Sequence, residues 1–542
     1  MQEDLKPTTY FLPGNANPTG SSFPVIAYNN FVFFKDSNSG TTADEGRDEV
    51  DDILTTIKNC GFNATIWSPE EINGTYWENL ITKYYNKASG NQLPTILEIP
   101  DIAPVVTQKL VQISGGALSL GGRPTGPMFG PEPMHYDNPT SEEYAEILNR
   151  DAGNANLWGY LLKNKPKFAN WGYDFVTMPT GMQDLQEAYR IFMQNNNAHV
   201  AFFNLAAERT AENIGDELTA PDLGKNDRER YELYLSEIQE KFTPQLMSVD
   251  LSPIIAAGDD PTNRIKWDYY FTLEAIGNVS KVTKVPFWLN ILCSQYTVYD
   301  VTEQDGTDDS SSTPVVKEKY PVVTEGMLRY QALTAIAHGI QGLVFGSYAP
   351  FTDEYNESNE LIKEFGIAPV DRNGHTTIVW RRCRAVIPEI KAFGQKLLGF
   401  HFNKAMHVYG PALNKIYYPN AQVVNVFFKL TNRFVGKCGC VIGASSDAEN
   451  GKGFVITDLS KKTGENTEEH YVAVVSHDFE NGQKIRLTLS PSLRMTVIEY
   501  DKDNGILKET RILPNSGGAS TASGIPITTT LKPGGMLLIK YN

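Results

Sequence analysis

Hydrophobic positions between residues 24 and 401 fall into two alternating kinds of segment. One kind is short and apolar at almost every position, as in Asn63–Trp67, which is typical of strands buried on both faces of a parallel sheet. The other kind is longer and repeats its apolar residues at helical spacing, as in Arg228–Lys241. The pattern predicts strands at 24–34, 63–67, 94–100, 157–162, 199–205, 246–250, 286–292 and 342–348. It predicts helices at 44–60, 76–88, 141–150, 183–195, 228–241, 267–282, 324–338 and 379–398.

This succession amounts to eight units, each a strand followed by a helix. Such alternation favours a parallel sheet, and eight units over this length suit a (β/α)8 TIM barrel with insertions. An open, doubly wound sheet is the alternative. No glycine-rich phosphate turn follows the first predicted strand, which weakens that alternative.

The pattern changes after residue 402, where helical spacing ends and short alternating strands begin. Strands are predicted at 405–409, 423–430, 469–475, 484–489, 495–501 and 536–540. Turn signals at 480–482, 503–505 and 533–535 separate several of them, which is typical of an antiparallel β-sandwich. We therefore expect an α/β fold with an extended N-terminal arm at 1–23, a TIM barrel at 24–401 and an all-β sandwich at 402–542.

Composition narrows the classes of function. The formal net charge is −16 and no Lys/Arg run forms a basic stripe, so a nucleic-acid partner is not expected. No run of about 18 apolar residues is present, so no transmembrane segment is expected. The start of the chain lacks the apolar core of a signal peptide. We expect a periplasmic or cell-surface protein whose export signal or lipid anchor has been removed, and a cytoplasmic protein stays open.

The five cysteines are too sparse to predict a disulfide framework. Cys438 and Cys440 fall in a strand-like run, and we expect both in one strand without a metal. The sequence holds no dinucleotide fingerprint, phosphate loop, zinc-binding His-Glu-x-x-His helix or Gly-x-Ser-x-Gly elbow. No cofactor or metal is therefore expected, and paired carboxylates are the main catalytic option.

The predicted strand ends carry amides, carboxylates and aromatic rings. In a TIM barrel the functional residues lie at these ends, and sugars need this mixture because hydroxyls bind polar groups and pyranose faces stack on rings. The candidates for carbohydrate binding are Trp67, Glu98, Trp158, Tyr160, Asn164, Lys165, Asn204, Gln295, Tyr296 and Tyr348.

Several segments, in this order, resemble bacterial glycoside-hydrolase-like barrels related to the β-galactosidases and clan A. They are 61–65, 156–162, 203–205, 247–250, 286–288 and 327–339. The segments 471–475 and 531–538 resemble the C-terminal sandwich of such enzymes. The resemblance implies hydrolysis of a glycosidic bond by two carboxyl groups.

The chain departs from that family where the chemistry is expected. The fourth strand of the family ends in Asp-Glu-Pro with the glutamate as proton donor, and the matching positions here are Asn164, Lys165 and Pro166. An ammonium is a weak acid near neutral pH unless burial lowers its pKa strongly. The seventh strand ends in Gln295, where the resemblance implies a nucleophilic glutamate.

Other acids remain as candidates for catalysis. Asp250 follows the sixth strand and Glu325 begins the seventh helix, and we take these two as the catalytic candidates. The first hypothesis is an O-glycosyl hydrolase that uses them. The alternative is a non-catalytic carbohydrate-binding pseudoenzyme on a hydrolase barrel, and a third is an interaction protein whose sandwich docks a partner.

Overall fold

The computed structural model describes residues 22–30, 45–67, 95–98, 157–164, 200–207, 227–256, 263–266, 268–300, 315–356, 359–409, 437–446, 452–512 and 524–542. The chain divides into two compact units. The first unit comprises Met1–Asp250, Val282–Asn290 and Gly342–Phe345, and the second comprises Leu251–Lys281, Ile291–Gln341 and Gly346–Asn542. The predicted division at residues 24 and 402 differs from these units and stays a prediction.

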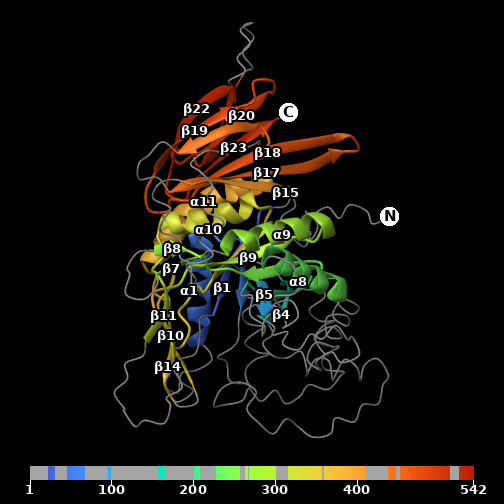
Figure 1. Ribbon diagram of the computed structural model, residues 1–542. Coiled ribbons are helices and arrows are strands. Elements are labelled where there is room, and N and C mark those ends of the chain that lie inside the picture. The colour runs from blue at the N-terminus through green and yellow to red at the C-terminus, as the bar shows by residue number, and fades with distance from the viewer. Residues whose placement is uncertain are drawn as a thin grey trace. The chain divides into compact units, whose positions relative to one another are not determined.

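Eight parallel strands form a closed sheet, which we call the strand ring. Figure 1 labels four of them, β1, β4, β5 and β9. They are β1 (Val25–Asn29), β2 (Ala64–Trp67), β3 (Thr95–Glu98), β4 (Leu157–Asn164), β5 (Val200–Ala206), β6 (Met247–Asp250), β9 (Phe287–Leu292) and β12 (Gly342–Gly346). Their order is β1-β12-β9-β6-β5-β4-β3-β2, and β1 pairs in parallel with both β2 and β12. Each strand lies within or overlaps a segment predicted as a strand, because the apolar runs are buried.

Two helices of the first unit cover the outside of this sheet. In α1 (Glu45–Cys60) the buried residues Ile53, Leu54 and Ile57 recur at helical spacing. In α8 (Asp227–Phe242) the ring of Phe242 packs edge-on against Phe203 of β5, with centroids 4.9 Å apart. Contact with α8 fixes Phe203 on the outer face of the strand ring.

The second unit contains three helices that the sequence predicted: α9 (Tyr269–Thr283), α10 (Glu325–Ala337) and α11 (Ile378–Leu397). Thr324 caps α10 by accepting a hydrogen bond from the backbone of Met327 at 3.2 Å. Thr377 caps α11 in the same way through Val379, at 3.1 Å. No helix within the described ranges is long and apolar enough to cross a membrane.

An antiparallel sheet in the second unit was not predicted from the sequence. Its strands are β7 (Ile254–Ala256), β8 (Asn263–Ile265), β10 (Tyr296–Asp300), β11 (Val315–Tyr320), β13 (Glu354–Tyr355) and β14 (Leu361–Phe365). They pair in the order β13-β14-β10-β11-β7-β8. In the chain these strands follow β6, β9 and β12, so the segments after three ring strands combine into one sheet, which we call the loop sheet.

Two further antiparallel sheets lie after residue 400. The larger has the order β15-β17-β18-β23-β20-β21, and the smaller has the order β16-β19-β22. Their bounds are β15 (His401–Tyr409), β16 (Val441–Ser446), β17 (Gly453–Gly464), β18 (Thr467–Ser476), β19 (Gln483–Leu489), β20 (Met495–Asp501), β21 (Ile506–Ile512), β22 (Ile525–Leu531) and β23 (Met536–Tyr541). The predicted turn at 503–505 joins β20 to β21, where Asp501 accepts a hydrogen bond from the backbone of Asp503 at 3.0 Å. The strand predicted at 423–430 lies outside the described residues.

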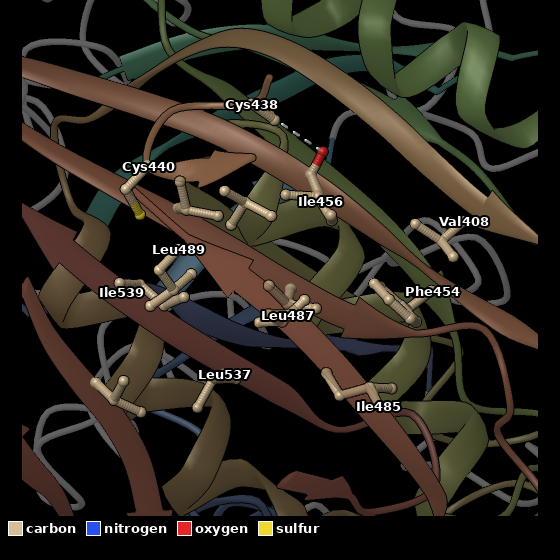
Figure 2. Packing of buried hydrophobic residues seen from close by; sticks show 14 of the residues in the cluster. Val408, Cys438, Cys440, Phe454, Ile456, Ile485, Leu487, Leu489, Leu537 and Ile539 are labelled. Atoms are coloured by element: carbon tan, nitrogen blue, oxygen red, sulfur yellow. Dashed lines mark hydrogen bonds between the residues drawn. The ribbon is translucent and has the colours of Figure 1, made fainter. Parts of the chain in front are cut away.

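The two sheets share one hydrophobic core. Figure 2 shows Phe454 and Ile456 of the larger sheet beside Ile485 and Leu487 of the smaller sheet. All four side chains are almost fully buried. Period-two alternation is the cause, since one face of each sheet is apolar.

The expectation that Cys438 and Cys440 lie in one strand is wrong. The backbones of Cys438 and Val441 exchange two hydrogen bonds of 2.9 Å, so Cys438, Gly439 and Cys440 form a tight turn at the entry to β16. The turn needs the positive φ of Gly439, +53°, which glycine adopts without a steric penalty. Both thiols are buried in the shared core, and Cys438 Sγ lies 3.7 Å from the carbonyl oxygen of Ile456 (Figure 2).

Candidate functional site

A polar row lies on the inner face of the strand ring. Phe203 faces α8 on the outside, and side chains alternate along a strand, so Asn204 faces inward. Asn204 is paired in register with Ser248 of β6, and Asp250 is paired with Asn290 of β9. We call Asn204, Ser248 and Asn290 the amide row.

Ser248 joins the two amides of the row. Its hydroxyl donates to the Oδ1 atom of Asn204 at 3.0 Å and lies 3.4 Å from the Oδ1 atom of Asn290. Asn204 and Ser248 are both 1% exposed. Because both amide oxygens face one hydroxyl, both amide nitrogens are directed away from it. The row therefore brings together two amides from the strands on either side of β6 and the hydroxyl of β6.

Phe202 and Trp288 lie two residues before Asn204 and Asn290 in their strands. The ring of Trp288 packs edge-on against Phe202, with centroids 5.4 Å apart. A Cβ atom on Gly342 would lie 2.6 Å from the Trp288 indole, so the glycine makes room for this ring. The amide row therefore rests on a packed apolar floor.

Asp250 lies one level toward the carboxyl end, on the same face as Ser248, because the two are two residues apart in one strand. It is half-buried, and it is paired in register with Ala206 on one side and Asn290 on the other. A carboxylate acceptor thus lies at the same level as an amide, at the end of β6.

The backbone register places other predicted residues at the carboxyl end of the ring. Asn164 is paired with Asn204, Glu98 with Leu161, and Trp67 with Asn29. Trp158 and Tyr160 lie earlier in β4. The side chains of Trp67, Glu98, Trp158, Tyr160 and Asn164 are not described, and Lys165 lies outside the described residues.

Gln295 of the second unit is held by backbone pairing after β9. Its N–H donates to the carbonyl of Ile367 at 2.8 Å, and its carbonyl accepts from the N–H of Gly366 at 2.8 Å. The side-chain oxygen packs over Gly366, where an added Cβ atom would lie 2.6 Å away. The residue is therefore fixed by the segment after β14.

Tyr296 belongs to a row of aromatic rings across the loop sheet. Its ring stacks on Tyr320 of β11, with centroids 4.0 Å apart and planes 17° apart, and tilts against Phe365 of β14 at 5.8 Å. Tyr320 in turn bonds to Lys266 at 2.6 Å. One face of the Tyr296 ring is therefore occupied by protein.

Tyr348 is fully buried, and its carbonyl accepts a hydrogen bond from Val370 at 3.0 Å. In this conformation its ring has no exposed face for a sugar. Nearby, the hydroxyls of Ser294 and Ser347 lie 3.2 Å apart, and the Cys293 thiol contacts the carbonyl of Ser347 at 3.2 Å. Burial raises the pKa of the Cys293 thiol well above its usual value, which keeps it protonated.

Glu325 takes part in an ion-pair network within the second unit. Its carboxylate accepts from Nη2 of Arg329 at 2.9 Å, and Nε of Arg329 donates to Glu389 of α11, also at 2.9 Å. Lys532 lies 4.0 Å from the same Glu389 carboxylate. The first turn of α10 also favours an acid through the helix dipole. The contacts described for Glu325 are thus structural.

Ser248 and Asn290 were not among the predicted site residues. A signal for both exists in the sequence, because each is a polar residue inside an apolar strand, in Met247–Asp250 and in Phe287–Leu292. In the described part of the chain, no group of three His, Cys, Asp or Glu residues could hold a metal ion.

No family model and no curated protein matches the chain. The similar solved structures are glycoside hydrolases. A catalytic mutant of a GH42 β-galactosidase from G. stearothermophilus is 10% identical with a TM-score of 0.44, over 96% of this chain and 98% of that one. The β-galactosidase of the psychrophilic Marinomonas ef1 is 9% identical with a TM-score of 0.37, over 69% of this chain and 60% of that one.

A β-glucosidase from Thermotoga maritima is 11% identical with a TM-score of 0.36, over 68% of this chain and 99% of that one. These levels of similarity assign no residue a role.

Proposed function

We propose that this chain is a glycoside-hydrolase-like protein that recognises a carbohydrate at the carboxyl ends of the strands in its ring. The fold proposed for it is a (β/α)8 barrel followed by a β-sandwich. The closed order of the eight parallel strands supports the barrel, and the core shared by the two C-terminal sheets supports the sandwich. In barrels of this kind ligands bind at the carboxyl ends of the strands.

The amide row beside Asp250 is the observation that carries the proposal. A sugar hydroxyl both donates and accepts a hydrogen bond, so it pairs well with a carboxylate and an amide N–H at the same level. Asp250 and Asn290 are such a pair in register. The Ser248 hydroxyl donates to the amide oxygen of Asn204 at 3.0 Å and lies 3.4 Å from that of Asn290, so it positions the Asn204 side chain directly. Buried, pre-oriented groups of this kind distinguish a ligand with hydroxyls from one without them.

A binding screen tests the proposal. Wild-type protein is screened against a glycan array and, in solution, against a panel of monosaccharides and oligosaccharides by calorimetry. We expect at least one neutral sugar to bind. Asp250→Asn removes the charged acceptor, and we expect affinity to fall by about tenfold or more, since a hydrogen bond to a charged group contributes about 1.5–3 kcal/mol.

The matched control is Asp503→Asn, the same change in an exposed turn of the second unit. It is expected to leave affinity unchanged. The proposal is rejected if the wild type binds no carbohydrate, or if both variants bind as the wild type does.

Hydrolysis is a second candidate, and the register of β3 favours it. Glu98 ends β3 as Asp250 ends β6, so two carboxyl-bearing residues lie at the same end of the ring. Glycosidases need two carboxyl groups about 5–9 Å apart. Turnover of aryl glycosides that is lost in both Glu98→Gln and Asp250→Asn would support hydrolysis. Binding without turnover in the wild type would exclude it.

A further inference from the structure

Three imidazole rings gather inside the second unit. His338 ends α10, His407 lies in β15, and His477 follows β18. The rings of His407 and His477 are stacked, with centroids 5.6 Å apart and planes 8° apart. Tyr270 of α9 packs edge-on against both, at 4.5 and 5.3 Å, and its ring lies 6.0 Å from that of His338. We call the three histidines the histidine joint.

We propose that the histidine joint attaches helices α9 and α10 to β15 and to the turn after β18 at neutral pH, and that acidification weakens this attachment. The joint lies away from the amide row in sequence and uses different residues. The proposal does not depend on whether the protein binds carbohydrate.

The surroundings of His338 favour the neutral form of its imidazole ring. Its Nδ1 lies 2.7 Å from the carbonyl of Thr334, so this nitrogen carries the proton and donates. Its Nε2 is buried and has no hydrogen-bond partner among the described residues. Phe402 stacks on the ring at 5.1 Å. A second proton would bury a charged N–H without an acceptor, and burial accordingly lowers the pKa of His338 to about 4.

His477 ends a chain of hydrogen bonds. Its Nδ1 lies 2.7 Å from the hydroxyl of Tyr270, which lies 2.7 Å from the hydroxyl of Tyr330. A neutral imidazole can accept from or donate to the Tyr270 hydroxyl through Nδ1. Protonation fixes Nδ1 as a donor, so Tyr270 can then only accept from it. Burial, followed by repulsion from His407 and His338, lowers the pKa of His477 well below its usual value.

Two acids lie near the joint, Glu274 and Asp478. Glu274 of α9 faces His407, with 3.8 Å between its carboxylate and Nε2. Asp478 follows His477 in sequence. Its carboxylate accepts from the backbone of Glu480 and Asn481 and lies 3.6 Å from Nζ of Lys452. Tyr270 of α9 and Tyr330 of α10 also place hydroxyls beside the joint.

Helix α9 packs tightly against β15 and the end of α10 beside the histidine joint. A Cβ atom on Gly277 of α9 would lie 2.7 Å from the ring of Phe402 in β15 and 2.9 Å from the carbonyl of His338. Helices α9 and α10 therefore touch β15 directly at this point. His338 and His477 are 0% and 1% exposed, so water reaches these two rings only if the elements separate.

The direction of the pH dependence follows from the two lowered pKa values. In the unfolded chain histidine has its usual pKa of about 6.5, so unfolding takes up protons below that pH. The stability from neutral His338 and His477 is complete above about pH 6.5 and is lost as the pH falls toward about 4, the folded pKa of His338.

Asparagine variants test the proposal in the full chain. In His338→Asn the amide nitrogen can still donate to Thr334, and in His477→Asn the amide oxygen can still accept from Tyr270. Unfolding is followed by calorimetry from about pH 7 to about pH 4.5. We expect the wild type to take up close to two more protons on unfolding than the double variant at about pH 5.

His375→Asn is the control, because His375 is an exposed turn residue of the same unit. It should retain the pH slope of the wild type. Coinciding slopes for the wild type and the double variant would overturn the proposal.

A measurement on the wild type covers the case in which the variants do not fold. With histidine labelled at Cε1, two resonances should remain unprotonated at about pH 5, well below the usual histidine pKa of about 6.5. Hydrogen exchange at about pH 5, corrected for intrinsic rates, should show faster opening of α9, α10 and β15 than of β19. Uniform titration near 6.5, or equal opening of all four elements, contradicts the joint.

Discussion

The hydroxyl of Ser248 and the amide oxygen of Asn204 lie 3.0 Å apart across neighbouring strands, and both residues are buried on the inner face of the strand ring. The same hydroxyl faces the amide oxygen of Asn290 on the other side. One small residue therefore contacts two amides, and Asp250 lies two residues further along its strand toward the carboxyl ends. The proposed carbohydrate site depends on this relationship.

Ser248→Ala should weaken the site by releasing both amides. The Asn204 oxygen would stay buried without its donor, so we expect unfolding to cost about 1–3 kcal/mol less. Carbohydrate affinity should fall because the amide donors are no longer held. Calorimetry and binding titrations measure the two effects.

Ser446→Ala is the matched control, since the Ser446 hydroxyl is buried without a hydrogen-bond partner among the described residues. Its removal should leave stability unchanged or raise it. Equal effects of the two substitutions would mean that the bonds of Ser248 contribute nothing.

Gly342→Ala should disturb the apolar floor beneath the amide row. The new Cβ atom would lie 2.6 Å from the Trp288 indole, too close for the ring to stay in place. Overpacking of this kind costs about 1–3 kcal/mol. Thermal unfolding measures the loss, and the near-ultraviolet circular dichroism of the tryptophans should change with it. An unchanged signal and midpoint would show that Trp288 moves freely.

The periodicity of the apolar residues and their burial explain which strands and helices could be predicted from the sequence. The ring strands are apolar at most positions, and α1 and α8 repeat apolar residues at helical spacing, so each is recognisable without its neighbours. The loop sheet is different. β7 and β13 are three and two residues long, and β10 pairs with β14, far away in sequence. Local patterns carry no information about such pairing.

The site was predictable only in part, for a related reason. Position at a strand end identified Asn204 and Asp250, because the carboxyl ends of parallel strands meet at one edge. Ser248 lies within its strand, and its importance comes from neighbours on two other strands. Tyr348 and Tyr296 also occupy strand ends, yet burial of the first and stacking of the second are tertiary facts.

Tyr296→Ala should mainly lower the stability of the loop sheet, and not the affinity for a carbohydrate. The substitution removes the ring that joins Tyr320 to Phe365, and loss of a large aromatic from a packed cluster costs about 3–5 kcal/mol when the residue is fully buried. Tyr296 is partly exposed, so we expect a smaller loss. Limited proteolysis between β10 and β11 should accelerate. Lost carbohydrate affinity with unchanged proteolysis would support a sugar platform instead.

Glu389 and Glu325 both bind the guanidinium of Arg329. Removal of Glu389 should lower the free energy of unfolding much more than removal of Glu325. The side chain of Glu389 is 4% exposed, and that of Glu325 is 41% exposed. In Glu389→Ala the buried Arg329 would keep only the half-exposed Glu325 as its partner in α10. Breaking a buried ion pair lowers the free energy of unfolding by about 3–5 kcal/mol. Glu325→Ala removes a half-exposed partner, for which about 1 kcal/mol or less is expected.

Glu325→Gln then separates a structural from a catalytic role for that residue. If Glu325 serves only the ion-pair network, the variant should unfold nearly as the wild type does and keep its affinity for carbohydrate. A glutamate that transfers a proton would instead lose about 10²-fold or more of any turnover at unchanged stability. Because Arg329 holds the carboxylate at 2.9 Å, we expect the first result.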